Sequence, residues 1–270
     1  MKWFTILLLF IPINLYSQPG YRVFDFVDPS LKSFSISTQI GTSYYYGDLC
    51  ETNDCYTKSN YNIGIGSTIR LNDYIFFNVD LIKYRIEGSD FDGGNLSRMR
   101  RNLSFRSDNY ELNLLGNFEF LNYNTFRYLT RQEFPISVFA FAGLGLTTNN
   151  PKTLYNGQWV ELRPLRTEGI TYSPVTLIIP IGLGVGYRFT DRFRMDFSVG
   201  YRWTASDYLD DVSTDYEDPN SFTNPIARDL QYRGDEVPFG KPQTLFGKDG
   251  PVRGNPKQND GYMLVGLKAE

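Results

Sequence analysis

The sequence predicts an all-β protein, an eight-stranded antiparallel transmembrane β-barrel of the outer-membrane type with long extracellular loops. From Ser33 to Gly47, large apolar or aromatic residues alternate with small polar ones over a run longer than the usual strand of a soluble protein. The composition is 16% aromatic with 24 Gly, yet the mean hydropathy is negative. A barrel wall with one lipid-facing side, aromatic girdles and one wet side produces this combination. Short and long connections also alternate along the chain.

The N-terminal segment predicts export. Residues 1–17 carry one positive charge at Lys2, a short apolar core and a small residue at Ser17, which is typical of a cleaved signal peptide. Residues 18–32 then form a periplasmic leader, and residues 33–270 form a single barrel domain. No later run is apolar for about eighteen residues, so no membrane-spanning helix is expected. No Cys follows the apolar core, which argues against a lipoprotein anchor.

The first half of the chain contains four alternating runs. The second run extends from Tyr61 to Leu71 and is followed by a tight turn at Asn72–Asp73. A third run, from Ile75 to Leu81, forms a hairpin with the second. The fourth run, from Tyr110 to Phe120, places carboxylates and amides on one face, as a wet barrel lumen would allow.

The second half supplies four more. The fifth run, Ile136 to Leu146, is ambiguous, because Phe139 and Phe141 fall on the face opposite its other apolar residues. The sixth and seventh runs extend over 175–188 and 193–203 and are joined by a turn at Thr190–Asp191. The eighth, Gly261 to Lys268, is short. Eight is an even number of strands, as single-chain outer-membrane barrels require.

The connections predict the topology of the barrel. The turns after the second and sixth runs are tight, and residues 122–134 after the fourth are a moderate connection. The connections after the first, third, fifth and seventh runs are longer, and the last extends over residues 206–260. Periplasmic turns and extracellular loops alternate in this way in outer-membrane barrels.

Charged residues on the wet faces predict a polar lumen. An eight-stranded barrel has an interior only wide enough for side chains to fill, so opposite charges must pair there. We therefore favour a salt-bridged plug over a charged conduit. The residues expected in this lumen network are Arg70, Asp80, Glu111, Glu119, Arg188, Arg194, Asp196 and Arg202.

Other motifs argue mainly against catalysis. The chain has no His, which excludes Ser-His-Asp and Cys-His nucleophiles, and its net charge of −3 argues against nucleic-acid binding. Cys50 and Cys55 predict a small disulfide loop, since a metal clip without His is the poorer interpretation. The acidic residues 207–218 favour a solvated loop, with calcium binding as the alternative. No cofactor is expected.

Five ordered blocks carry a family resemblance. They are Tyr46-Gly47-Asp48-Leu49, the block from Arg101 to Asp108, the block from Asn150 through Trp159 to Gly169, the block from Asp207 to Ser213, and the block from Arg253 to Asp260. Over about residues 34–267 the chain resembles the PorG-like outer-membrane β-barrel proteins of Bacteroidota. The resemblance implies a component of the type IX secretion system, which also serves gliding motility. It departs from such barrels in ending without a terminal aromatic residue.

The resemblance implies specific partners. In that family the barrel ties the periplasmic ring, made from a lipoprotein and its partner, to the outer membrane. A non-enzymatic anchor in the outer membrane is thus the first hypothesis, and a small solute-binding or transport barrel is the alternative. An outer-membrane enzyme ranks last. The residues expected to face the periplasmic ring are Asn72, Asp73, Asn122, Tyr123, Arg127, Asp191 and Arg192.

Overall fold

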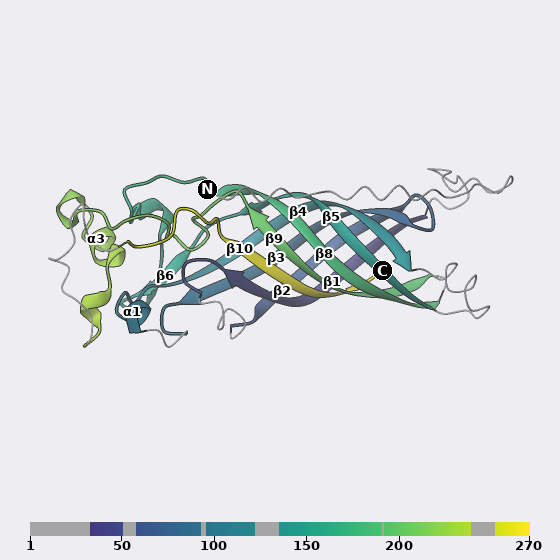
Figure 1. Ribbon diagram of the computed structural model, residues 1–270, viewed down its shortest axis with the longest axis horizontal. Coiled ribbons are helices and arrows are strands. Elements are labelled where there is room, and N and C mark those ends of the chain that lie inside the picture. Colours follow the sequence, from purple (N-terminus) through teal and green to yellow (C-terminus); the bar gives the residue numbers. More distant parts are fainter. Residues whose placement is uncertain (1–32, 51–57, 93–95, 122–134, 191, 239–251) are drawn as a thin grey trace, which may run out of the picture.

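The computed structural model describes residues 33–50, 58–92, 96–121, 135–190, 192–238 and 252–270, so the expected signal peptide and leader lie outside the described residues. Eight long strands form a barrel (Figure 1). They are β1 (Ser33–Tyr46), β2 (Asn60–Arg70), β3 (Ile75–Ser89), β4 (Ser104–Leu121), β5 (Ile136–Thr148), β8 (Val175–Thr190), β9 (Phe193–Thr204) and β10 (Gly261–Ala269).

The barrel is closed and antiparallel throughout. Each strand pairs with its neighbour in the order β1-β2-β3-β4-β5-β8-β9-β10, and β10 pairs back onto β1 from Thr38↔Ala269 to Tyr46↔Gly261. The prediction of an eight-stranded antiparallel barrel is therefore confirmed. An eight-stranded closed sheet of this kind has no edge strand, so each strand of the wall has a paired neighbour on both sides.

The two ends of the barrel differ. At one end, called the turn end, lie the Asn72–Asp73 turn, Arg192 and the C-terminus; at the other, the loop end, lie the long connections (Figure 1). The loop end carries α1 (Leu96–Met99), η1 (Arg163–Leu165), η2 (Pro219–Ser221), α3 (Pro225–Gln231) and η3 (Gly234–Glu236). No helix among the described residues is long and apolar enough to cross a membrane.

The outer wall of the barrel is apolar. On β4, the alternate side chains of Tyr110, Leu112, Leu114 and Phe118 are 50–57% exposed, while Glu111 and its alternating partners point inward and are buried. The same inversion recurs on β2, β3 and β8. A continuous exposed apolar band of this kind is suited to lipid rather than water.

The band ends on β3 and β4 at a change of residue type. Beyond Leu81 and Leu112, the outward cross-strand pairs become polar, while the ladder of backbone hydrogen bonds continues to Ser89↔Ser104. These pairs are Lys83 over the Tyr110 ring, Arg85 with Asp108 at 2.7 Å, and Glu87 with Arg106. Charged cross-strand pairs stabilise a sheet in water and would be costly in hydrocarbon. The two strands thus project beyond the band.

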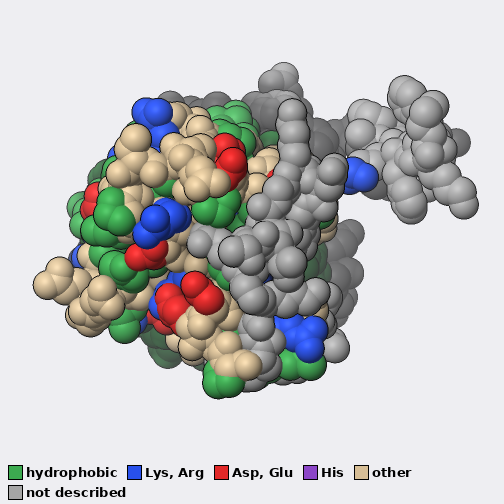
Figure 2. Space-filling view, turned by 90° about the vertical axis from the view of Figure 1, so that its left-hand side faces the viewer, with side chains coloured by type: hydrophobic (Ala, Val, Ile, Leu, Met, Phe, Trp, Pro, Cys, Tyr) green, Lys and Arg blue, Asp and Glu red, His purple; other side chains and the backbone are tan. Residues whose placement is uncertain are grey.

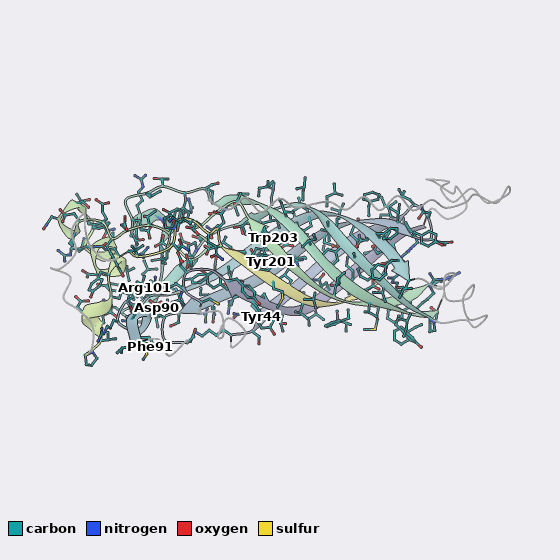
Figure 3. The ribbon with its side chains drawn as sticks, viewed as in Figure 1. Tyr44, Asp90, Phe91, Arg101, Tyr201 and Trp203 are labelled. Atoms are coloured by element: carbon teal, nitrogen blue, oxygen red, sulfur yellow. The ribbon has the colours of Figure 1, made fainter. Side chains whose placement is uncertain are left out.

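Aromatic side chains mark the same boundary elsewhere on the wall. Tyr44, Tyr201 and Trp203 lie at similar heights along the barrel, whereas Asp90 and Arg101 lie farther toward the loop end (Figure 3). Tyr201 packs edge-on against both Tyr46 and Trp203, with ring centroids 5.6 and 5.3 Å apart. Amphipathic rings of this kind form the girdle of a membrane barrel at the interface.

Three expectations about the connections require correction. Residues 104–108, expected in a loop, belong to β4, because their charges pair across the strand ladder. Residues 152–161, also expected in a loop, form a hairpin of β6 (Lys152–Tyr155) and β7 (Gln158–Glu161), which joins β4 through Lys152↔Arg106. Residues 206–260, expected to be structureless, include η2, α3 and η3.

The structure also settles the ambiguous fifth strand. Phe139 and Phe141 point into the barrel and are buried, with Val138, Ala140 and Ala142 toward the outside. Glycines at the paired positions of the adjacent strand β8 provide the space. A Cβ built on Gly184 would lie 2.2 Å from Phe139 Cζ, and one built on Gly182 would lie 2.4 Å from Phe141 Cζ. The alternate glycines Gly182 and Gly184 thus make room for the two phenyl rings.

Candidate functional site

Charged side chains fill the lumen near the turn end. Glu119 accepts hydrogen bonds from Arg70 at 2.7 Å and from Arg194 at 3.1 Å, and Arg194 Nε also donates to Asp196 at 2.5 Å. The guanidinium of Arg70 lies 4.6 Å from the centre of the Phe76 ring. Glu119 on β4 is therefore neutralised by arginines from β2 and β9, and Asp196 by Arg194 of its own strand, so that each buried carboxylate has a cation beside it.

Two further ion pairs lie in the lumen, nearer to the loop end. Lys268 donates to Asp80 at 2.7 Å, and Glu111 accepts from Arg202 at 3.3 Å and from the Tyr262 hydroxyl at 2.5 Å. The sequence analysis missed Lys268 and Tyr262. Both occupy the inward positions of the alternation on β10, so counting along that strand could have found them.

The prediction that Arg188 belongs to the lumen network is wrong. Its side chain is exposed at the turn end of β8, where Tyr187, Phe189 and Thr190 are exposed as well. The register with β9 shifts between Arg188 and Thr190, and Arg188 lies opposite Arg194. Because Arg194 already occupies this position beside Glu119 and Asp196, a second buried guanidinium there would meet a like charge.

The network leaves little free space in the lumen. The cavity between Asp80, Asp196, Arg202 and Lys268 has a volume of about 30 Å³. A volume of this size holds a water molecule or two rather than a solute. The interior is therefore a polar plug, and the geometry offers no open conduit through the described part of the barrel.

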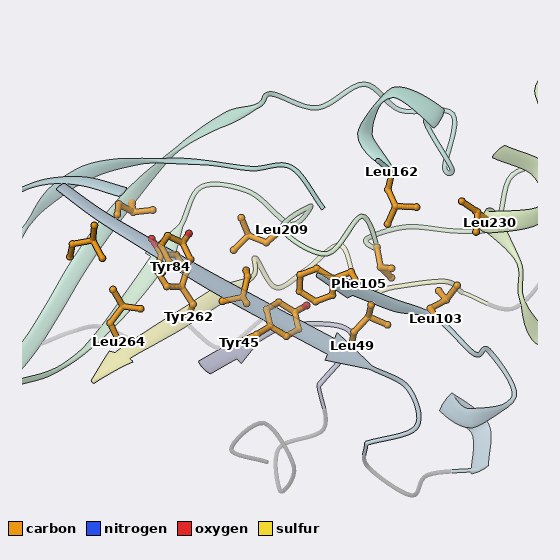
Figure 4. Close-up of a cluster of buried hydrophobic side chains, with 14 residues drawn as sticks. Tyr45, Leu49, Tyr84, Leu103, Phe105, Leu162, Leu209, Leu230, Tyr262 and Leu264 are labelled. Atoms are coloured by element: carbon orange, nitrogen blue, oxygen red, sulfur yellow. The ribbon is translucent and has the colours of Figure 1, made fainter. Parts of the chain in front are cut away.

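A second core lies above the lumen and is shared with the loops. Tyr84 and Tyr262 stack at its base with centroids 4.5 Å apart, and Phe105 packs edge-on against Tyr45 at 4.7 Å (Figure 4). Side chains from the connecting segments complete it. These are Leu49, Leu103, Leu162, Leu209, Val212 and Leu230, all buried. The connections at the loop end thus pack into a cap with its own apolar core.

Buried charges hold the cap together. Arg253 donates to Glu168 at 2.8 Å and to the backbone carbonyls of Asp211 and Gln231. Glu168 also accepts from the backbone amides of Ser213 and Thr214 at 3.0 and 2.9 Å. One arginine therefore joins three segments that are far apart in the sequence.

The pKa values of the two carboxyl groups beside Arg253 shift in opposite directions. Burial alone would raise the pKa of Glu168, but the guanidinium and the backbone hydrogen bonds outweigh it and hold the pKa below its ordinary value. For Asp211 burial is the stronger effect, and it raises the pKa to about 6 even though Arg253, Thr167 and Tyr172 face that carboxyl. Glu168 is consequently the permanent anion of this pair.

The acidic segment after β9 differs from its expected form. Asp207, Asp210 and Asp211 are at most 9% exposed, so the first part of this stretch is buried in the cap, whereas Asp215 and Asp218 are exposed as a solvated loop would be. Within the residues described, no group of three or more Asp, Glu or Cys side chains is arranged to hold a metal ion. Neither calcium nor another metal is therefore placed here.

All five blocks that carry the family resemblance meet in this cap. Asp48 from the first block accepts the backbone amide of Asn255 from the last at 2.7 Å. Arg101 from the second block donates to the carbonyl of Asp48 at 2.9 Å and to that of Arg253. The third and fourth blocks contribute Glu168 and Asp211, as described above. The signature residues therefore share one structural task, which is to close the loop end.

The cap surface mixes charges of both signs. Seen face-on in Figure 2, the described part of the loop end shows Lys and Arg side chains interspersed with Asp and Glu. A hollow of about 520 Å³ lies between the β6–β7 turn and α3, lined by Tyr155, Asp229 and Tyr232 among others. No large field of one sign is apparent on this face.

The remaining predicted residues are only partly described. Asn72 accepts hydrogen bonds from the backbone amides of Tyr74 and Ile75 at 2.8 and 2.7 Å and so shapes its own turn, next to Asp73. Arg192 is exposed at the turn end. Cys50 is disulfide-bonded. The predicted residues Cys55, Asn122, Tyr123, Arg127 and Asp191 lie outside the described residues.

Most of the chain matches a known protein family. A family model described as Domain of unknown function (DUF6089) matches residues 24–226. The chain belongs to this family. The DUF6089 match includes β1 to β9 and the first four signature blocks, and it ends before the fifth block and β10. No curated protein matches the chain.

Solved barrels show weaker similarity to this DUF6089 chain. Neisserial surface protein A (NspA) is 12% identical with a TM-score of 0.43, covering 87% of this chain and 94% of that one. Ail, the attachment invasion locus protein of Yersinia pestis, is 11% identical with a TM-score of 0.40, covering 88% and 96%. The N-terminal barrel domain of Pseudomonas aeruginosa OprF is 11% identical with a TM-score of 0.37, covering 88% and 96%. The barrel assignment itself rests on the strand register.

Proposed function

We propose that this protein is a non-enzymatic anchor in the bacterial outer membrane that ties the periplasmic ring of the type IX secretion and gliding machinery to the membrane. The filled lumen is the observation that carries this proposal. A barrel with a cavity of about 30 Å³ and ion-paired walls suits attachment rather than passage of a solute. The resemblance of the five signature blocks to PorG-like proteins supports the choice of machinery.

The proposal assigns a task to each part of the molecule. The apolar band of the wall holds the barrel in lipid, and the cap closes its outer end. By the usual layout of such barrels, the short turns face the periplasm and the long loops face outward. The turn end, with its exposed Arg188 and Arg192, then meets the ring lipoprotein and its partner.

Deletion of the gene tests the biological role. The expected result is loss of secretion of cargo carrying the C-terminal signal and loss of gliding in a species that glides. Complementation with the intact gene serves as the control. Normal secretion in the deletion strain would exclude this role.

A pull-down from detergent-solubilised envelopes tests the contact. Ring proteins are expected to co-purify with the intact barrel after mild crosslinking. Charge reversal at the turn end, R188E with R192E, is expected to reduce their recovery at least several-fold. The matched control is R228E on the exposed face of α3, which keeps recovery unchanged. Equal loss from both variants would contradict a docking surface at the turn end.

A further inference from the structure

A tyrosine and two carboxylates meet in the cap. Tyr45 lies near the end of β1, Asp210 lies in the segment after β9, and Asp260 directly precedes β10. The Tyr45 hydroxyl oxygen lies 2.5 Å from Asp210 Oδ2 and 3.1 Å from Asp260 Oδ1. All three side chains are at most 2% exposed. They connect both ends of the long segment 206–260 to the first strand.

The number of protons in this cluster follows from its geometry. A phenol carries one O–H proton, so Tyr45 donates to one carboxylate and has only a lone pair to offer the other. The backbone amides of Leu209 and Val212 donate to the outer oxygens of Asp260 and Asp210, at 2.8 Å each. Asp210 Oδ2 and Asp260 Oδ1, which these amides do not contact, face the Tyr45 hydroxyl. A second hydrogen bond at Tyr45 therefore needs a proton on a carboxyl group.

The surroundings do not neutralise a second negative charge. The groups that face the pair from neighbouring segments are Asp48, Asp207, Tyr201 and Arg101. Arg101 is the cation among them, and its guanidinium already forms a two-pronged pair with Asp90 at 2.9 and 2.6 Å. Asp207 is 9% exposed, and its Oδ1 is buried without a hydrogen-bond partner. The cluster as a whole is short of protons or cations.

We propose that Asp210, Asp260 and Tyr45 form a proton-dependent latch: the residues around Asp210 and Asp260 are held to the end of β1 while one of the two carboxyl groups keeps a proton and donates it to Tyr45, and they loosen when that proton leaves. Two buried carboxylates beside the same phenol oxygen repel strongly once both are ionised, because the low dielectric of the cap screens them little. The Coulomb energy is relieved only by separating the two loop ends. This latch is a property of the cap and does not depend on the function proposed above.

Linkage gives the direction of the pH effect. Burial and the charge of Asp48 raise the pKa of Asp210, and burial with the charges of Asp210 and Asp207 raises the pKa of Asp260. The closed cap thus binds more protons than the open one, in which a carboxyl pKa returns to about 3.9. The latch is fully effective at acid pH and is lost as the pH rises through the raised values. Glu168, with its lowered pKa, acts in the opposite sense at the acid end.

Hydrogen exchange of the full chain in detergent micelles tests the latch. The amides of Leu209 and Val212 donate to the pair, so their protection reports directly on closure. After correction for intrinsic exchange, their protection factors are expected to fall with rising pH by up to about tenfold per unit, the dependence of one proton. Amides in the β5–β8 ladder are expected to keep constant protection over the same range.

Two amide variants and one control separate the latch from general instability. Asp210→Asn or Asp260→Asn keeps the side-chain shape but removes one ionisation, so protection should become independent of pH. Asp235→Asn makes the same chemical change at an exposed position of the same segment and should retain the wild-type pH dependence. Constant protection in the wild-type chain between about pH 5 and pH 9, or an unchanged pH dependence in both amide variants, would overturn the proposal.

Discussion

At the scale of single residues, the lumen is built from pairs of complementary size. Phe139 and Phe141 project from β5 into space left by Gly182 and Gly184 on the adjacent strand β8 and by Gly200 on β9. A narrow barrel can accommodate a phenyl ring only where the neighbouring strands leave room by having no side chain. The glycines are therefore packing partners of the rings.

Enlarging one of these glycines is expected to destabilise the barrel. Gly184→Ala places a Cβ 2.2 Å from Phe139 Cζ and should cost about 1–3 kcal/mol of unfolding free energy. In a double-mutant cycle, Phe139→Leu should recover part of this cost. Urea unfolding in vesicles measures both effects. Gly116→Ala is the matched control, because the Cβ added there would lie 3.5 Å from its nearest neighbour, Phe77 Cε1. An equal loss of unfolding free energy in Gly116→Ala would contradict the steric explanation.

Removal of the cap arginine is a second prediction at this scale. Arg253→Met leaves Glu168 and Asp211 without their buried cation and should weaken the cap by about 3–5 kcal/mol. The loss should shrink at acid pH, because Glu168 can then take up a proton. Hydrogen exchange of the Ser213 and Thr214 amides measures it. Arg228→Met, at an exposed ion pair, should change their exchange little; a similar effect in both variants would argue against a special role for Arg253.

At the scale of elements, β3 and β4 show how one ladder serves two environments. Their alternation and pairing continue without interruption from Ile75↔Phe118 to Ser89↔Ser104. Only the outward residue types change, from leucines to paired charges. Strand length is therefore governed by backbone pairing, while the position of the membrane is governed by side-chain chemistry.

A lysine scan along β4 is expected to locate this boundary. Leu114→Lys places a charge in the apolar band and should cost up to about 2–4 kcal/mol, whereas Ser104→Lys lies on the same face beyond the band and should cost little. The folded fraction after refolding into vesicles measures the difference. Equal tolerance of lysine at both positions would be inconsistent with lipid around Leu114.

At the scale of the whole molecule, a plug and a cap close the barrel. The ion pairs centred on Glu119, Glu111 and Asp80 span the lumen, and the loops pack over its outer end. Such an arrangement makes the barrel a rigid body. It agrees better with an anchor than with a pore.

Conductance recordings in planar bilayers test whether the barrel is closed. The reconstituted chain should give no stable conductance steps, because the lumen cavity of about 30 Å³ has room for only a water molecule or two. Arg194→Gln leaves Glu119 with Arg70 alone, so it should lower stability rather than open a path. Discrete conductance that disappears in Arg194→Gln would instead support the transport hypothesis.

Much of the fold could be predicted because a strand has a period of two. Six of the eight predicted strands agree with the observed bounds to within two residues at each end. The alternation also identified inward charges such as Glu111 and Arg202, which the structure brings together. It missed the outer halves of β3 and β4, because their outward residues are charged and resemble a loop. It also missed the place where the β8–β9 register shifts, which leaves Arg188 exposed.

The candidate site was harder to predict from the sequence, since its contacts join distant segments. Asp48, Glu168, Asp211 and Arg253 each look like solvated loop residues in the sequence, and no local period links them. Alternation along the chain predicts a lipid-facing barrel with a polar interior, because successive side chains of a strand point to opposite faces of the sheet. Which charges are buried together in the cap depends on how four loops pack over one barrel end, and that is a property of the folded chain only.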